Sequence, residues 1–255
     1  MSASRTIALS AGHGQRLLYH QRRWVSLGAA TLAAVAGYTD TVMLRLTRTP
    51  VSHLSGLTAR ATVDEAMGRA TDLHLAVGVI AAFMSGAACA GALIGTSQVV
   101  PGRRYSVVLW LEGVLLCLAS VLLVHGSRWA LPAGAFACGL QNGMANGFYG
   151  TVIRTTHLSG ILTDIGVLLG HAVRRHRITT WRLVLLGGIV CGFVVGGVTG
   201  ALAADRRGGA ALLAPAVACL AGGTAYFLWL TRDRASRRAG RGGRPRRVDS
   251  SGAAA

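Results

Sequence analysis

Lysine is absent from this chain, and charged residues of every kind are few. Only 14% of the 255 residues are charged, whereas an ordinary soluble domain has about 25%. All 26 basic residues are arginines, and with 9 acidic residues they give a formal net charge of +17. So little charge beside 52% hydrophobic residues argues against a water-soluble enzyme. It also argues against disorder over most of the chain, because disorder needs low hydrophobicity.

The sequence also lacks the motifs of common catalytic and metal sites. It has no nucleophile elbow, no zinc-ligand spacing, no close pair of catalytic carboxylates and no phosphate-binding glycine loop. Its cysteines form no C-x-x-C pair and predict neither a disulfide nor a metal site. They lie singly, at Cys89, Cys117, Cys138, Cys191 and Cys219. We therefore expect that the protein is not an enzyme and that it uses no metal and no cofactor.

What the chain does have is six long stretches almost without charge. Each is about 20 residues or longer, and only Asp40 and Glu112 interrupt them. A helix of about 20 residues, rising about 1.5 Å per residue, crosses a hydrocarbon core of about 30 Å. The sequence therefore predicts an all-α integral membrane protein with six transmembrane helices. The stretches are 24–44, 75–102, 105–127, 129–153, 183–204 and 208–231.

The first stretch admits a second interpretation. Arg22 and Arg23, the apolar run after them and Ala34-Val35-Ala36 together resemble a secretory signal with its cleavage site. Five further stretches follow, and the residues after Ala36 have a counterpart later in the chain. We therefore expect the first helix to be retained.

The placement of the arginines predicts the orientation. With the N-terminus in the cytoplasm, 19 arginines fall on the inner side and 7 on the outer side, as the positive-inside rule favours. We expect a multi-pass protein of the bacterial plasma (inner) membrane with both termini cytoplasmic. Residues 1–23 form the N-terminal segment. The Arg-rich tail, 232–255, is expected to be disordered and to contact anionic lipid rather than a specific nucleic acid.

Short motifs recur in the same order in the two halves of the chain. The offsets between partners are 100 to 110 residues. Three spans per half is an odd number, so the halves would face in opposite directions, as in many secondary transporters. The sequence thus predicts two inverted three-span repeats, 24–127 and 128–231. The paired segments are 37–40 with 139–142, 53–56 with 157–160, 62–68 with 163–170, and 83–86 with 193–196.

These motifs resemble those of the YoaK family, a group of bacterial inner-membrane proteins classed as a domain of unknown function. The resemblance covers roughly residues 25–230 and is carried by Gly37-Tyr38-x-Asp40, by Gly139-Leu140-Gln141-Asn142 and by the second His-Leu-Ser-Gly-x-Leu-Thr-Asp. Where the family usually has Met-Thr-Gly-Asn, this chain has His53-Leu54-Ser55-Gly56. The resemblance implies a fold and a membrane location. It implies no substrate, because the family has no established activity.

Asp40 and Asn142 hold matching positions near the ends of equivalent spans. The glycines beside them could let each helix break, and broken helices offer free backbone groups to a ligand. Alternatively, Asp40 caps the next helical segment. Gln141 adjoins Asn142 and could hydrogen-bond between helices. All three residues are candidates for substrate binding.

The two His-Leu-Ser-Gly motifs supply a second symmetric set of candidates. Histidine titrates near pH 6.5, which suits proton coupling, and the residues after it could begin a short helix whose N-terminus attracts an anion. Alternatively, the motifs are turns that only shape the start of the next helix. The candidates from this region are His53, Ser55, His157, Ser159 and Asp164.

Glu112 lies within the third uncharged stretch. An ionisable side chain at the centre of a bilayer costs about 2.5–3.5 kcal/mol on insertion scales, so such residues are candidate functional groups. The carboxyl could hold a proton or cation, or balance the charge of a substrate. Alternatively, it is a structural partner for an arginine or a protonated acid that hydrogen-bonds across helices.

The segment 157–173 is too short for a span, because its apolar part is only about 12 residues. We expect a re-entrant or interfacial helix, like its polar counterpart 50–71, in which Asp64 is expected to be solvated. The helices are also rich in glycines, and the spacings of four among them place glycines on one helix face, which predicts close helix packing. These glycines are Gly86, Gly91, Gly95, Gly188, Gly192, Gly196, Gly200, Gly222 and Gly223.

The sequence thus favours a transporter of a small molecule or ion, with its site at the interface of the two halves. The alternative is a non-transporting membrane assembly or regulatory protein. An intramembrane enzyme is the weakest interpretation. Ser55 and Ser159 lie two residues from a histidine and would point in a different direction on a helix, so they predict no catalytic dyad.

Overall fold

The structure, a computed structural model, describes residues 2–68, 70–95, 102–145, 155–175 and 180–242. Within these ranges the regular structure is entirely helical. The α-helices are α1 (Ser2–Thr47), α2 (Leu54–Ala66), α3 (Ala70–Ile94), α4 (Arg103–Val124), α5 (Ala130–Ala145), α6 (Leu158–Val173), α7 (Thr180–Arg207) and α8 (Leu213–Gly242). A short 3-10 helix, η1 (Gly208–Leu212), joins α7 to α8.

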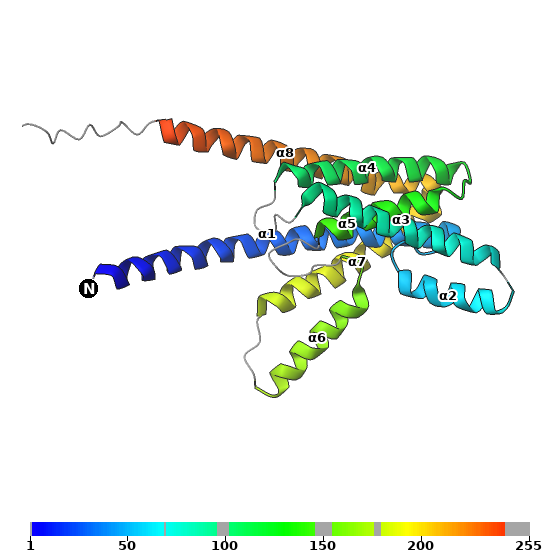
Figure 1. Cartoon of the computed structure of the whole chain (residues 1–255), viewed down its shortest axis with the longest axis horizontal. Helices are drawn as coiled ribbons and strands as arrows, with labels where there is room; N and C mark the ends of the chain where they lie inside the picture. The colour runs from blue at the N-terminus through cyan, green and yellow to red at the C-terminus, as the bar shows by residue number, and fades with distance from the viewer. Residues whose placement is uncertain (1, 69, 96–101, 146–154, 176–179, 243–255) are drawn as a thin grey trace, which may run out of the picture.

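Four segments are long and apolar enough to cross a membrane. They are Trp24–Thr47, Leu73–Ile94, Arg103–Val124 and Thr180–Asp233. The last has 54 residues, or about 80 Å of helix, far more than one crossing of about 30 Å needs. It contains α7 and α8, and the chain reverses direction at η1 between them (Figure 1). The described part of α5 has 16 residues.

The outer surfaces of these helices are apolar, which a water-soluble bundle would not tolerate. Large hydrophobic side chains are exposed along α3, α4, α7 and α8, among them Met84 at 64%, Val114 at 56% and Val195 at 61%. A lipid environment accounts for this exposure, because hydrocarbon tails are as apolar as these side chains. The chain is a membrane protein.

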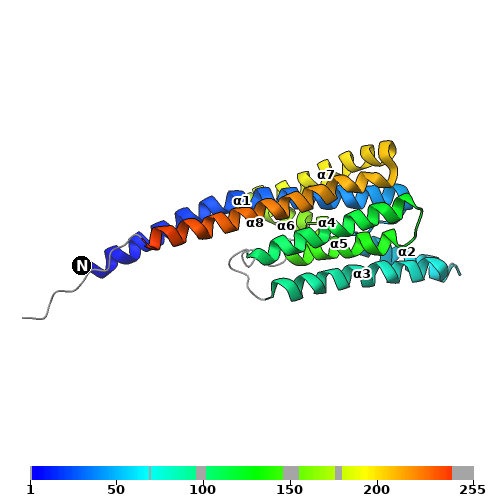
Figure 2. The same cartoon turned by 90° about the horizontal axis from the view of Figure 1, so that it is seen from above.

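Apart from the short helices α2 and α6, the helices pair across the two halves of the sequence. α1 packs along α7, α3 packs along α5, and α4 packs along α8. When the short helices α2 and α6 are left aside, the first helix of each half therefore lies against the second helix of the other half. Figure 2 shows the helices running roughly parallel or antiparallel, with the Ser2 end of α1 and the Gly242 end of α8 projecting from the same end of the bundle.

Glycines allow α1 and α7 to approach closely. A Cβ added to Gly196 would collide with the carbonyl of Ala34, and one added to Gly37 would collide with the carbonyl of Phe193. The expected helix break beside Asp40 is therefore wrong: α1 continues unbroken to Thr47. Gly37 serves backbone contact between helices, so it need not bend its own helix.

The same contacts recur between α3 and α5. A Cβ on Gly86 would collide with the carbonyl of Phe136, and one on Gly139 with the carbonyl of Phe83. These are the counterparts of the α1–α7 contacts, displaced by 102 residues between α1 and α5 and by 110 between α3 and α7. The helix break expected beside Asn142 is likewise not observed, because α5 runs through it to Ala145.

The α4–α8 contact is reciprocal in the same way. A Cβ on Gly113 would lie 2.9 Å from the carbonyl oxygen of Ala216, and one on Gly223 would lie 3.1 Å from that of Ser106. Both partners of each contact are displaced by 110 residues. The close packing predicted for Gly86, Gly192, Gly196, Gly200 and Gly223 is confirmed. It is wrong for Gly91 and Gly222, which face open space with nothing within 4 Å.

The two short helices differ in how they attach. α2 packs against α3, whereas α6 packs against α7. α2 buries Leu57, Ala61 and Asp64, but α6 buries only Ile161 and leaves apolar residues such as Leu162 and Val167 exposed. Both begin where the sequence predicted a short helix, directly after a histidine.

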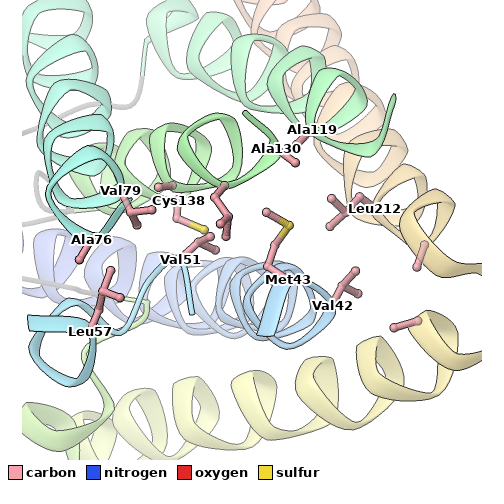
Figure 3. Packing of buried hydrophobic residues seen from close by; sticks show 14 of the residues in the cluster. Val42, Met43, Val51, Leu57, Ala76, Val79, Ala119, Ala130, Cys138 and Leu212 are labelled. Carbon is pink, nitrogen blue, oxygen red and sulfur yellow. The ribbon is translucent and has the colours of Figure 1, made fainter. Parts of the chain in front are cut away.

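The largest apolar cluster binds the two halves together. Met43 and Val51 from the first half meet Cys138 of α5 and Leu212 of η1, as Figure 3 shows. Val51 of this cluster lies in the connection between α1 and α2, close to the first group of candidate residues.

The Arg-rich end of the chain is partly helical. α8 continues to Gly242, into the segment for which we expected no fixed structure, since alanine and arginine favour helix. Residues 243–255 of the expected tail lie outside the described residues.

Candidate functional site

Asp40 holds the connection between α1 and α2. It is 2% exposed and lies near the C-terminal end of α1. One carboxylate oxygen, Oδ1, accepts hydrogen bonds from the backbone N–H groups of Val51 at 3.0 Å and Ser52 at 2.7 Å. These two residues directly precede His53, the N-cap of α2, so Asp40 ties the connection before the helix and does not cap the N–H groups of its first turn.

His53 binds the second oxygen of the same carboxylate. Its Nδ1 lies 2.8 Å from Asp40 Oδ2, close enough for an N–H donated by the histidine. This hydrogen bond with Asp40 raises the pKa of His53 above its ordinary value, and the negative charge of Asp40 adds to the effect, while burial opposes it. The His53 side chain is 42% exposed, whereas that of Asp40 is 3% exposed, so the histidine is the member of the pair that reaches the surface of the bundle.

His53 also touches the other half of the chain. Its ring meets the ring of Phe193 edge-on, with centroids 5.6 Å apart. Phe193 lies on α7 and supplies the carbonyl that faces Gly37. The Asp40–His53 pair therefore lies where α1, the α1–α2 connection and α7 meet, at a contact between the two halves.

The matching place in the second half is built without charge. Asn142 Oδ1 accepts a hydrogen bond from Thr156 Oγ1 at 3.2 Å, and Asn142 Nδ2 donates to the carbonyl of Cys138 at 2.9 Å. Thr156 precedes His157 as Ser52 precedes His53. The connection before α6 is thus tied to α5 by neutral groups.

Gln141 links the halves elsewhere. It is 1% exposed, and its Nε2 donates a hydrogen bond to the carbonyl of Leu32 in α1. This confirms the expectation that Gln141 hydrogen-bonds between helices. The bond satisfies a buried amide that would otherwise be costly.

The structure does not gather all the predicted site residues. Asp40 and His53 are in contact, and Asn142 and Gln141 lie at the matching position on α5. The remaining residues of the two short helices face outward: Ser55, His157, Ser159 and Asp164 are exposed. Asp164 therefore faces away from the helix contact that α6 makes through Ile161.

Glu112 is in a different place, in the middle of α4. It is 1% exposed. The thiol of Cys219, on α8, makes a hydrogen bond with its carboxyl. A negative charge on the thiol of Cys138, on α5, would be opposed by both Glu112 and Asp40. The two buried carboxyls thus share a cysteine as a neighbour, although they belong to different helices.

Sequence reasoning missed three features of this region. Asp64 is 6% exposed, not solvated, and its carboxylate lies 3.6 Å from Arg60 Nε one helical turn away. The i, i+4 spacing could have indicated that pair. Phe193, Cys138 and Cys219 were not among the predicted site residues, and no sequence pattern would have placed them beside ionisable groups.

Within the ranges that the structure describes, no group of three or more histidine, cysteine, aspartate or glutamate side chains is placed to hold a metal ion. The chemistry available is proton binding and hydrogen bonding by buried polar groups.

These observations define an all-helical integral membrane protein with buried polar groups at the contacts between its two halves. The chain belongs to the family described as protein of unknown function (DUF1275), whose profile matches residues 28–225. It is also similar to a UPF0700 transmembrane protein, RA0705, from Rhizobium meliloti (strain 1021), with 30% identity over 204 residues, which is 78% of this chain and 86% of that protein. No solved structure matches the chain. The resemblance seen in the motif residues is confirmed.

Proposed function

We propose that the chain is built from two inverted three-span repeats, 24–127 and 128–231. The reciprocal glycine contacts support this proposal, because each contact of α1 with α7 has a counterpart between α5 and α3. The six crossings are α1, α3, α4, α5, α7 and α8. In this scheme α2 and α6 are interfacial helices on opposite sides of the membrane, and α6, about 24 Å long, is too short to span.

We propose the bacterial plasma membrane as the location, with both termini in the cytoplasm. The two ends of the described chain project from the same end of the bundle, which fits an even number of crossings. The positive-inside rule then assigns that end to the cytoplasm, since the arginines of α8 lie there. Arginines at this end are suited to contact anionic lipid headgroups.

Within this frame, we propose that the protein transports a small molecule or ion through the interface of the halves, without catalysing a reaction. The observation that carries the proposal is the Asp40–His53 pair, a buried carboxylate with a half-exposed histidine, pressed against Phe193 of the other half. In inverted-repeat transporters, one repeat moves against the other around such a place. A change in the charge or position of His53 would therefore act directly on α7 through the contact with Phe193.

A ligand screen by thermal shift tests this proposal. The purified protein in nanodiscs is heated with libraries of metabolites and ions, alongside His53→Gln. A compound that binds only the folded state adds about 2.7 kcal/mol at 100 times its Kd, which displaces the melting temperature measurably. We expect at least one compound to stabilise the wild type and to lose its effect in His53→Gln, while His171→Gln, on the exposed face of α6, retains it.

A screen in which no compound stabilises the wild type would contradict transport and favour the second candidate, a membrane assembly or regulatory protein. One observation favours that candidate. α6 buries a single residue against the rest of the chain and leaves Leu162, Val167 and Leu169 exposed. Such a helix could dock on another membrane protein, so the next experiment would be a search for partners that require α6.

A further inference from the structure

Glu112 is a buried ionisable group that the proposed site does not use. It lies midway along α4, next to Gly113, whose missing side chain lets α4 approach α8. Its counterpart 110 residues later is Gly222, so the acid is unique to one half. A carboxylate held in hydrocarbon is costly unless a partner compensates its charge.

The surroundings of Glu112 provide no such charge. Cys219 of α8 makes the hydrogen bond to its carboxyl, and Cys138 of α5 is the other titratable neighbour, with Asp40 of α1 beyond it. Among the described residues, no arginine or histidine forms an ion pair with Glu112. Its Oε2 atom is buried and has no hydrogen-bond partner there.

This environment selects a proton over a metal cation. Sodium-like and divalent hard cations need several oxygen ligands, whereas the groups beside Glu112 are thiols and the apolar side chains of the cluster formed by Leu116, Ala137, Ala216 and Cys219. A proton needs one oxygen only. Bound to the carboxyl, it turns a costly buried charge into a neutral acid.

We infer that Glu112 is a proton-exchange site inside the membrane, at the contact between α4 and α8. The carboxyl holds a proton while the contact is closed. When the helices part and admit water, the O–H bond breaks, the proton passes to water and a carboxylate remains. The inference makes the proton the coupling ion of transport, and only this use of the proton rests on the proposed function.

Infrared spectroscopy can observe this proton directly, because a protonated carboxyl has a carbonyl stretching band that a carboxylate lacks. The chain has two glutamates, Glu65 and Glu112, and Glu65 is exposed on α2. In full-length Glu65→Gln labelled with carbon-13 glutamate, the isotope-shifted band reports Glu112 alone. The protein is studied in nanodiscs over a pH series, in H2O and in D2O.

We expect a labelled acid band that shifts in D2O and disappears reversibly as the pH rises. Glu112→Gln loses the band completely, whereas Asp164→Asn, which removes an exposed acid on α6, retains it. If Glu112→Gln does not fold, the label in Glu65→Gln still identifies the band. A carboxylate at every pH, or an acid band that neither exchanges nor titrates, would overturn the inference.

The outcome is independent of the ligand screen. If Glu112 titrates and no compound binds, the proton-exchange site is supported and the transport proposal is contradicted. If compounds bind and Glu112 does not titrate, the transport proposal is supported, but a proton on Glu112 is not the coupling ion.

Discussion

The starts of α2 and α6 share one geometry but are held by different chemistry. His53 and His157 are the N-cap residues, with φ −94° and ψ 64° in the first and φ −89° and ψ 61° in the second. The first start is tied by the carboxylate of Asp40, whereas the second is tied by the neutral amide of Asn142. The backbone conformation therefore does not depend on the charge.

The charged contact before α2 and the neutral contact before α6 differ in what they can respond to. A pair of ionisable groups can respond to pH or to a charged ligand, and a pair of neutral groups cannot. One half of the molecule thus carries the ionisable contact, while the other keeps a neutral copy of the same connection. Glu112 shows the same asymmetry, because its counterpart Gly222 carries no ionisable group.

The largest expected effect comes from breaking the shared packing. Gly196→Ala would place a methyl group against the backbone carbonyl of Ala34, and overpacking of this kind costs about 1–3 kcal/mol, occasionally more. Gly86→Ala should cost a similar amount, since it makes the matching contact with Phe136. Both are measured as losses of melting temperature in detergent.

The matched control for these variants is Gly91→Ala. Gly91 faces open space, and alanine is favoured over glycine in a helix by about 0.5–1 kcal/mol. A large loss in Gly196→Ala with none in Gly86→Ala would refute the equivalence of the two contacts.

A smaller but still substantial effect is expected at Asp40. Asp40→Ala leaves the N–H groups of Val51 and Ser52 without their acceptor, and unsatisfied buried groups cost about 1–3 kcal/mol each. Asn142→Ala should cost less, about 0.5–1.5 kcal/mol, since the bonds lost there are neutral. Thermal unfolding of the two variants side by side measures the difference, and equal losses would show that the charge adds nothing.

The pH dependence sharpens the comparison further. The raised pKa of His53 means that the folded state binds its proton more tightly than the unfolded chain. This contribution to stability is complete below the unfolded pKa near 6.5 and is lost as the pH rises through the raised folded value.

Histidine NMR and melting curves from pH 5 upward test this expectation. Asp40→Asn should remove the shift of His53. His157→Gln serves as the control, because it leaves the Asp40–His53 contact in place. A His53 titration that does not move in Asp40→Asn would show that Asp40 is not its cause.

The smallest effect is expected at the ion pair between Arg45 of α1 and Asp205 of α7. Their closest atoms are 2.9 Å apart, but both side chains are more than half exposed. Exposed pairs contribute about 0.2–1 kcal/mol. Arg45→Gln should therefore lower the melting temperature slightly, and the difference from wild type should shrink as salt is added. A loss as large as that of Asp40→Ala would contradict this ranking.

The membrane helices could be predicted because a helix that crosses a bilayer needs a long apolar stretch with few charges. Long uncharged stretches correspond to α1, α3, α4, α7 and α8, and the His-Leu-Ser-Gly motifs correspond to the starts of α2 and α6. Periodicity also indicated that Gly192, Gly196 and Gly200 pack closely.

The pairing of helices could not be predicted in the same way. The sequence of α1 does not identify α7 as the helix that packs against it, because lipid-facing and helix-facing surfaces are both apolar. The error at Gly37 has the same origin: a small residue beside Asp40 can mark either a bend or a contact. The bonds of Asp40 required knowledge of where the α1–α2 connection turns back, which depends on tertiary packing.

The packing of α1 against α7, a helix of the other half, affects the order in which the protein assembles. More than 130 residues separate the end of α1 from the start of α7, and synthesis at about 5–20 residues per second takes on the order of ten seconds to cover them. During that interval α1 is present without the surface that its glycines fit. Membrane insertion of the first helix and its final docking are therefore separate events, and a nascent chain stopped before Thr180 presents the Gly37 face to lipid or to an assisting insertase.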